Sequence, residues 1–224
     1  MKQLNVVISG FDHYDGVKVN PAYEVPKALA EQGMGDTGAL DDIDVAIHAV
    51  SLPVSFANAW PMLLEAIEAV QADIIIATGL KHAARGVMLE RCATNLMDAA
   101  KPDIDNMAPR REPIDPDGPA AYWTRLPLRS ILRDFARDGI PSTLSSDAGT
   151  FVRTSLFYNL LNWTSTQDHV LSGFVSFPLV CEAGASGVGH LGLPLERQID
   201  ACRDVVREVV AYYMKPSSSD ILID

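Results

Sequence analysis

Cysteine is scarce in this chain of 224 residues, which has only Cys92, Cys181 and Cys202 and no CxxC pair. Three is an odd number, and without close pairs these residues predict neither a disulfide framework nor a cysteine-based zinc site. The cysteine content is therefore typical of a protein kept in a reducing compartment, and we expect the cytoplasm.

Basic residues and long apolar runs are also lacking. Lys and Arg number 18 against 29 Asp and Glu, which gives a formal net charge of −11. Without a basic cluster, the sequence predicts no binding to nucleic acid or to an anionic membrane. No apolar run reaches the roughly 18 residues that a bilayer-spanning helix needs. The N-terminal MKQLNVVISG indicates a first strand rather than a signal peptide.

Motifs of several common enzyme classes are missing as well. The chain has no GxxxxGK(S/T) phosphate loop, no GxGxxG directly after a predicted strand, and no GxSxG nucleophile elbow. Its five histidines form no HExxH and do not pair closely with cysteine. We therefore expect neither a metal nor a cofactor, and these generic motifs alone would leave the function open.

The composition that remains is that of a globular protein, with 48% apolar and 21% charged residues. Short runs rich in β-branched residues predict buried strands at Leu4–Ser9, Val45–Val50, Ile74–Ala77 and Val170–Phe177. Strands separated by amphipathic segments favour an α/β fold, a three-layer α/β/α sandwich with a twisted, largely parallel central sheet. We expect one domain over residues 1–215, followed by a polar tail over 216–224.

Helices are predicted where apolar residues recur at helical spacing. The predicted helices lie over 60–67, with Pro61 near the first turn, over 128–135, ended by Gly139 and Pro141, over 150–163, and over 195–209. Cys202 lies on the apolar stripe of the last one and is expected in the core. In such sheets the functional residues usually lie where strands end. We therefore expect them in the loops 9–16, 79–85 and 145–153.

Longer stretches of the sequence resemble one known family. The matching segments are Ser9-Gly10-Phe11-Asp12 with Asn20-Pro21, Leu52–Phe56, Leu89–Asn95 with Asp98-Ala99, Gly118–Thr124, Ala148–Val152, and Gly173–Val175 with Pro178. In this order and spacing they resemble the pyroglutamyl peptidase I family, the pyrrolidone-carboxylate peptidases. The resemblance extends from about Met1 to Pro178.

The resemblance implies a fold and an activity. Members of this family are cytosolic cysteine peptidases that remove an N-terminal pyroglutamate, and they have an α/β/α sandwich and often form tetramers. Catalysis uses Cys, His and Glu, with the Cys as nucleophile and the His as proton carrier. By resemblance we expect a homo-oligomer, either a dimer or a tetramer, and a small molecule or a peptide N-terminus as ligand.

The catalytic positions of the family are only partly kept. Glu90 matches the catalytic acid, but Arg153 stands where the family has Cys, and Ser176 stands where it has His. An arginine stays protonated and cannot act as a nucleophile. A serine hydroxyl has no basic form at neutral pH. We therefore predict that cysteine-peptidase chemistry is lost and that the protein is a pseudoenzyme or binds a small anionic ligand.

The ligand-binding positions implied by the resemblance are changed in part. Ala100 replaces an arginine expected to help the oxyanion, Leu80 stands where the family often has Gln, and Lys101 replaces an apolar residue. The aromatic pair of the lactam pocket is kept in type. The predicted ligand-binding set is therefore Phe11, Tyr14, Leu80, Lys101, Phe151 and Val152.

Two hypotheses explain an arginine at the nucleophile position. In the first, Arg153 forms an ion pair with Glu90, because a buried guanidinium needs an anion. In the second, Arg153, with Lys101 or Arg85, receives the carboxylate or phosphate of a small ligand. The two hypotheses are compatible.

Other routes to catalysis stay open. Glu90 could serve as acid and base on a different, carboxylate-bearing substrate. Pyroglutamyl hydrolysis could also persist by another nucleophile, such as Cys181 near His190, or Cys92, which would share the face of Glu90 on one strand. Ser145 and Ser146 precede the nucleophile turn, but no basic partner is evident for them.

Overall fold

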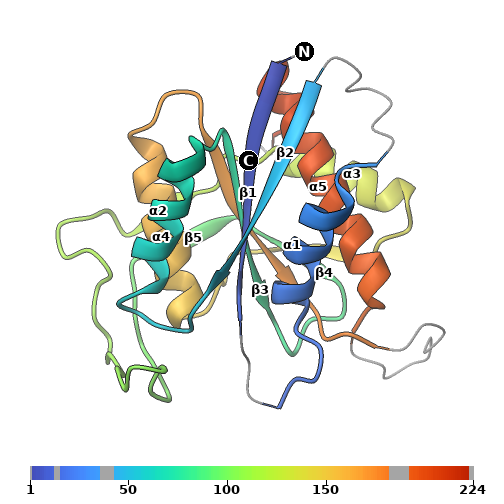
Figure 1. The fold of residues 1–224 in the computed structure, drawn as a ribbon. Helices are drawn as coiled ribbons and strands as arrows, with labels where there is room; N and C mark the ends of the chain where they lie inside the picture. The colour runs from blue at the N-terminus through green and yellow to red at the C-terminus, as the bar shows by residue number, and fades with distance from the viewer. Residues whose placement is uncertain (1, 13–15, 36–42, 182–191, 222–224) are drawn as a thin grey trace.

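A central sheet organises the molecule, which we describe from a computed structural model for residues 2–12, 16–35, 43–181 and 192–221. In this part of the chain the sheet has six strands, in the order β2-β1-β3-β8-β4-β7 (Figure 1). Their bounds are β1 Lys2–Phe11, β2 Ile43–Leu52, β3 Ile74–Leu80, β4 Val87–Glu90, β7 Ser142–Ser145 and β8 Leu171–Phe177. The four strands predicted from sequence are all confirmed.

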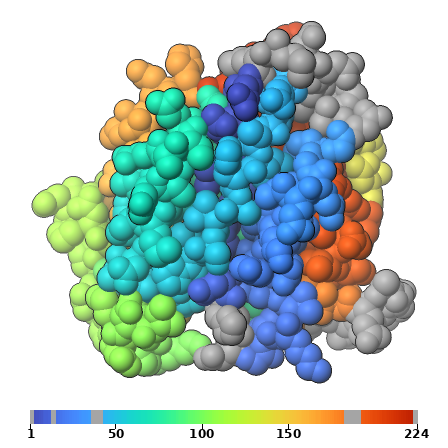
Figure 2. All heavy atoms as spheres, in the orientation of Figure 1, coloured from blue at the N-terminus to red at the C-terminus, as the bar shows by residue number. Residues whose placement is uncertain are grey.

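The direction of the strands is largely parallel, as predicted. β2, β1, β3 and β8 run in one direction, whereas β4 is antiparallel to β8 and parallel to β7. The edge strand β2 lies at the surface between neighbouring helices (Figure 2). A second, two-stranded sheet pairs β5 (Cys92–Thr94) with β6 (Ala121–Trp123). The reversal at β4 was not predicted, and it decides what Glu90 contacts.

Helices cover both faces of the sheet and complete the three layers. Those found in the described residues are α1 (Pro21–Gln32), α2 (Ala59–Val70), α3 (Leu128–Arg137), α4 (Val152–Ser165) and α5 (Leu195–Met214). The helices α1, α3 and α5 lie on one face, and α2 and α4 lie on the other (Figure 1). The α/β/α sandwich expected from the sequence is confirmed.

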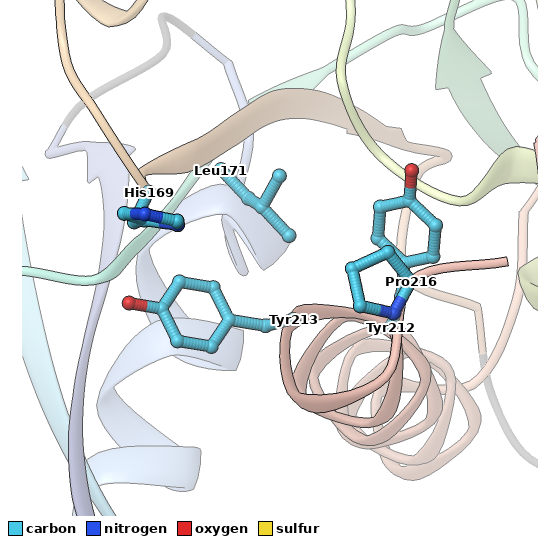
Figure 3. A pocket seen from close by; sticks show the side chains of 5 residues that line it. All are labelled: His169, Leu171, Tyr212, Tyr213 and Pro216. Carbon is cyan, nitrogen blue, oxygen red and sulfur yellow. The ribbon is translucent and has the colours of Figure 1, made fainter.

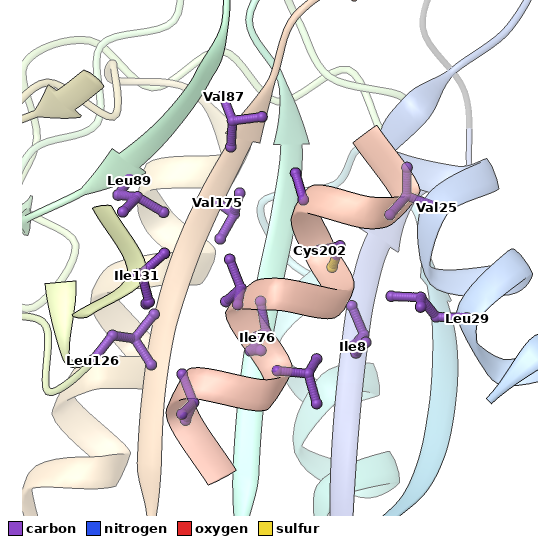
Figure 4. Close-up of a cluster of buried hydrophobic side chains, with 14 of the residues drawn as sticks. Ile8, Val25, Leu29, Ile76, Val87, Leu89, Leu126, Ile131, Val175 and Cys202 are labelled. Carbon is purple, nitrogen blue, oxygen red and sulfur yellow. The ribbon is translucent and has the colours of Figure 1, made fainter. Parts of the chain in front are cut away.

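Two apolar cores hold the layers together. On the α5 face, Cys202 is fully buried among the side chains of β1, β3 and β8 (Figure 4), which confirms its predicted place in the core. On the α4 face, the rings of Phe157 and Phe174 lie 5.4 Å apart and are both fully buried. The helix α4 is thus buried as predicted, although it begins at Val152 rather than Thr150.

The helix α1 was not predicted, because Pro26 lies inside it. Proline has no N–H, so the carbonyl of Ala22 loses its usual helical donor. The hydroxyl of Thr78 on β3 shares its proton between that carbonyl, at 3.2 Å, and the Ser9 carbonyl, at 2.9 Å. A Cβ atom on Gly10 would overlap the Ala22 carbonyl oxygen. Glycine at position 10 therefore lets α1 approach the sheet.

The asparagine of the first matching segment has a local role. Asn20 caps α1 by accepting from the Ala22 N–H at 3.1 Å, and its side chain donates to the Phe11 carbonyl at 2.7 Å. Such a cap satisfies an N–H that the first turn of a helix leaves free. Asn20 therefore fixes the end of β1 against the start of α1.

The C-terminal tail contacts α3 in the part that is described. The carbonyl of Asp220 accepts from the backbone N–H groups of Arg129 and Ser130, at 2.9 and 3.2 Å. This contact supplies an N-terminal cap that the side chain at Pro127 does not provide. Among the described residues, no helix is long and apolar enough to cross a membrane.

Candidate functional site

Glu90 and Ser176, two of the predicted site residues, meet in the core of the sheet. The antiparallel pairing of β4 with β8 sets Met88 opposite Ser176 and Glu90 opposite Phe174. The Ser176 hydroxyl donates to Glu90 Oε1 at 2.6 Å, and both side chains are fully buried. The other carboxylate oxygen, Oε2, has no hydrogen-bond partner among the residues that the structure describes. Glu90 is thus held in the core by one hydrogen bond from the described residues.

Arg153 lies in the first turn of α4 and bonds to backbone carbonyls. Its Nε donates to the Ala148 carbonyl at 2.6 Å, and its Nη1 donates to the Leu80 carbonyl at 3.2 Å. The side chain is half-buried. Its Nη2 has no hydrogen-bond partner within the described part of the chain. The guanidinium is thus oriented by the protein and keeps one donor nitrogen available.

The predicted ion pair between Arg153 and Glu90 is wrong. Each group has other partners, namely two carbonyls for the guanidinium and Ser176 for the carboxylate. No ion pair joins the two, although both lie in the described part of the chain. The physical reason is the register of β4, which brings a hydroxyl rather than the guanidinium to Glu90.

The loop before α4 is shaped by local hydrogen bonds. Gly149 has a φ of +84°, a left-handed conformation that glycine adopts at low cost. Its N–H donates to the Asp147 carboxylate at 2.8 Å, and the Thr154 hydroxyl donates to the carbonyls of Ala148 and Gly149. Asp147 and Thr154 were not predicted from the sequence. The pattern Asp-x-Gly, which is typical of an Asx turn, could have indicated Asp147.

Two of the matching segments meet beside this loop. The Thr150 hydroxyl donates to the Asp98 carbonyl at 2.7 Å, and the Asp98 N–H donates to the Thr150 carbonyl at 3.0 Å. Lys81 also reaches the loop, donating from Nζ to the Asp147 carbonyl at 2.8 Å. The segments 98–99 and 148–152, far apart in sequence, therefore form one structural unit at the start of α4.

The predicted ligand-binding residues divide into three groups. Leu80 and Val152 are both buried. Val152 precedes Arg153 in the chain, and the Leu80 carbonyl accepts a hydrogen bond from the Arg153 guanidinium. Phe151 is half-buried, with its ring edge-on to Phe56 at 5.3 Å. Of the remaining three, Phe11 is buried at the end of β1 in the same apolar core as Val152, Lys101 is exposed, and Tyr14 lies outside the described residues.

The alternative nucleophiles have poor surroundings where they are described. Cys92 begins β5, which belongs to a different sheet from the strand of Glu90, so the two do not share a strand face. Its thiol donates to the Ser146 carbonyl at 3.8 Å, and burial raises its pKa. A raised pKa disfavours the thiolate that attacks. Cys181 is half-buried, and His190 lies outside the described residues.

The two serines before the nucleophile turn also have partners. The Ser146 hydroxyl accepts from Arg91 Nε and Nη2 at 2.8 and 2.6 Å, and the Ser145 hydroxyl donates to the Asp147 carbonyl at 3.2 Å. These partners are a cation and a backbone carbonyl, and neither can act as a general base. Within the described ranges, no group of three His, Cys, Asp or Glu residues could hold a metal ion.

Comparison with known proteins decides the relationship. The family model described as pyroglutamyl peptidase matches residues 4–212. The chain belongs to this family. It is similar to the pyrrolidone-carboxylate peptidase of Bacillus subtilis strain 168, with 39% identity over 176 residues, 78% of each chain. It is also similar to that of Bacillus mycoides, with 32% identity over 214 residues, 92% of this chain and 96% of the relative.

Solved structures of the family have the same fold. The pyrrolidone carboxyl peptidase of Thermococcus litoralis superimposes with a TM-score of 0.85 at 29% identity, over the full length of both chains. The pyroglutamyl peptidase I of Bacillus amyloliquefaciens gives a TM-score of 0.81 at 31% identity, covering 98% of this chain and all of the other. The family resemblance predicted from the sequence is confirmed.

Proposed function

We propose that this family member does not hydrolyse pyroglutamyl peptides by cysteine chemistry and instead binds a small carboxylate-bearing molecule at the start of α4. One observation supports this most directly. The residue that follows Ala148–Val152, where the resemblance places the nucleophile, is Arg153. Its guanidinium is held by two carbonyls with Nη2 left over. A planar guanidinium is well suited to a carboxylate.

The surroundings of Arg153 favour an anion. The start of α4 offers backbone N–H groups and the positive end of the helix dipole. The neighbouring acid Glu90 does not neutralise the guanidinium, because its hydrogen bond comes from Ser176. Arg153 bonds to backbone carbonyls rather than to an acid, so no carboxylate of the described residues neutralises it. A carboxylate ligand would supply the missing anion.

A second candidate function rests on Glu90. Its Oε2 is buried and has no hydrogen-bond partner in the described part of the chain, so this oxygen could exchange a proton with a ligand that enters the core. The second candidate is an enzyme on the same scaffold, with Glu90 as acid and base on a carboxylate-bearing substrate. A Glu90→Gln variant distinguishes the two, because it would abolish such turnover and leave the binding of a carboxylate to Arg153 intact.

The hydrolysis test uses a fluorogenic pyroglutamyl substrate. We expect no turnover by the wild type, whereas an Arg153→Cys/Ser176→His double variant gains turnover because it restores the nucleophile and the base. The Arg153→Cys single variant is the matched control and stays inactive, since it has no base. Wild-type turnover that iodoacetamide abolishes would contradict the proposal.

The binding test uses thermal unfolding with pyroglutamate, glutamate and succinate as probes. A ligand that binds only the folded state raises the melting temperature by mass action. We expect at least one carboxylate to stabilise the wild type and not Arg153→Met. The control is Arg129→Met, which removes an exposed arginine on α3. If the shift is the same in all three proteins, Arg153 is not the binding group.

We also propose a homo-oligomer, a dimer or a tetramer, in the cytoplasm. The support is the family membership together with the reducing compartment that the cysteines favour. Size-exclusion chromatography with light scattering tests the oligomer, and a monomeric mass at micromolar concentration would refute it.

A further inference from the structure

A cavity lies at the C-terminal end of α5, between this helix and the start of β8. It has a volume of about 440 Å³ and is lined by His169, Leu171, Tyr212, Tyr213 and Pro216. His169 and Tyr213 lie on one side and Tyr212 and Pro216 on the other (Figure 3). Small-molecule sites usually measure about 300 to 1,000 Å³. None of these residues belongs to the site at Arg153, so this cavity is separate from the proposed function.

Rings dominate the lining of this cavity. Two tyrosines, a histidine and a proline make up four of its five described lining residues, and none of the five is Lys or Arg. The face of an aromatic ring has a negative potential that attracts cations. His169 is held in the left-handed region at φ +58°, which is uncommon outside glycine.

The carboxylate of Asp73 lies behind the cavity and favours a cation. The Tyr213 hydroxyl donates to Asp73 Oδ1 at 2.9 Å, and the Asn5 N–H donates to Oδ2 at 2.9 Å. Burial, with the nearby carboxylate adding to it, raises the pKa of Tyr213 to about 12. The phenol therefore keeps its proton, and a phenol that donates to a carboxylate has a more electron-rich ring.

The end of α5 adds negative potential. A helix of 20 residues ends here without a basic residue in its last turn, and the exposed Lys215 follows as its C-cap residue. Carbonyl groups at a helix C-terminus have a partial negative charge, which a cation stabilises. Residue 216 is proline, so it offers no N–H to the Tyr212 carbonyl four residues earlier. The rings, the Asp73 carboxylate and the helix end favour a cation, and the charge of the exposed Lys215 opposes it.

From this convergence we propose that the cavity formed by His169, Leu171, Tyr212, Tyr213 and Pro216 binds a small organic ammonium cation. The cation lies against the tyrosine rings, and the helix end and Asp73 supply the opposite charge. The net charge of −11 raises the local concentration of such cations at low ionic strength. The ligand is a quaternary or protonated amine without a large anionic group.

The test compares choline with 3,3-dimethylbutan-1-ol, which has the same shape without the charge. Isothermal titration calorimetry measures both affinities, and NMR of selectively labelled tyrosine locates the site. We expect saturable binding of choline that shifts the signals of Tyr212 and Tyr213, and binding of the neutral analogue weaker by about 5- to 30-fold. Equal affinities, or no saturation by choline up to about 50 mM, would overturn the proposal.

Variants of Tyr212 show whether the ring face is responsible. Tyr212→Leu should weaken choline binding by about 5- to 30-fold, whereas Tyr212→Phe retains the ring and most of the affinity. The matched control is Tyr23→Leu on α1, which should leave choline binding unchanged. Circular dichroism checks that each variant is folded. If Tyr212→Leu binds choline as well as the wild type does, the assigned site is wrong.

Discussion

The hydrogen bond from Ser176 to Glu90 gives the sharpest test of how the altered site is held. Ser176→Ala removes the one hydrogen bond that the Glu90 carboxylate receives from the described residues, because Oε2 has no partner there. Both residues are fully buried, so water cannot replace the lost donor without opening the core. The substitution leaves the volume nearly unchanged, and its effect therefore reports the hydrogen bond.

The expected magnitude follows from the charge and burial of the acceptor. A hydrogen bond to a charged group contributes about 1.5 to 3 kcal/mol, and a bond between neutral groups about 0.5 to 1.5 kcal/mol. We expect Ser176→Ala to lower the free energy of unfolding by about 2 kcal/mol. With a urea m-value of about 2 kcal/mol per molar, the unfolding midpoint falls by about 1 M.

A double-mutant cycle with Glu90→Gln isolates the interaction. The amide keeps an oxygen that accepts from Ser176 but removes the charge, so Glu90→Gln alone should be neutral or stabilising. In the Glu90→Gln background, Ser176→Ala should lower the free energy of unfolding by only about 0.5 to 1 kcal/mol. The coupling energy between Glu90 and Ser176 is then about 1 kcal/mol.

The assay is urea unfolding at pH 7, followed by circular dichroism and tryptophan fluorescence in all four proteins. Coincident transitions by the two probes justify comparing the midpoints. The reasoning is refuted if Ser176→Ala shifts the midpoint equally in the wild type and in the Glu90→Gln variant. It is also refuted if the shift in the wild-type background is below about 0.2 M.

Three further predictions test other parts of the structure. Gly10→Ala should lower the free energy of unfolding by more than about 4 kcal/mol, because its Cβ would overlap the Ala22 carbonyl oxygen. A soluble variant with the urea midpoint of the wild type would contradict this prediction. Tyrosine ordinarily titrates near pH 10, and burial with a carboxylate partner raises the pKa of Tyr213 to about 12. Its stabilisation is therefore complete below about pH 10 and is lost between about pH 10 and 12. Over that range of pH the urea midpoint should fall more steeply in the wild type than in Tyr213→Phe. Parallel curves of midpoint against pH in the two proteins would contradict this prediction. In the folded protein Cys202 should not react with Ellman's reagent, because it is fully buried and its pKa is raised to about 12, whereas the half-buried Cys181 should react first. Labelling of Cys202 before Cys181, read by mass spectrometry, would show that the core opens readily.

Four of the six described strands of the central sheet could be predicted because they are short β-branched runs, of which Ile74–Ala77 is the clearest example, whereas the four-residue strands β4 and β7 were not predicted. The helix α1 could not, because Pro26 breaks the expected pattern and its effect is offset by Thr78, a residue distant in sequence. Local sequence does not record which distant side chain will replace a missing helical donor.

The matching segments gave the positions of the candidate site, but its contacts could not be predicted from the sequence. The matching segments identified Glu90, Arg153 and Ser176 by position. Which of them touch depends on the antiparallel register of β4 against β8 and on the carbonyls that face Arg153. A sequence gives the charge of a side chain, but the partner of that charge is set by the pairing of strands.

The contact between Asp220 and α3 has a consequence for the order in which the chain folds. The N–H groups of Arg129 and Ser130 receive their acceptor from Asp220, which follows α4, β8 and α5 in the sequence. During synthesis α3 emerges from the ribosome long before that acceptor exists. The first turn of α3 therefore stays solvated until Asp220 has been synthesised and has left the ribosome.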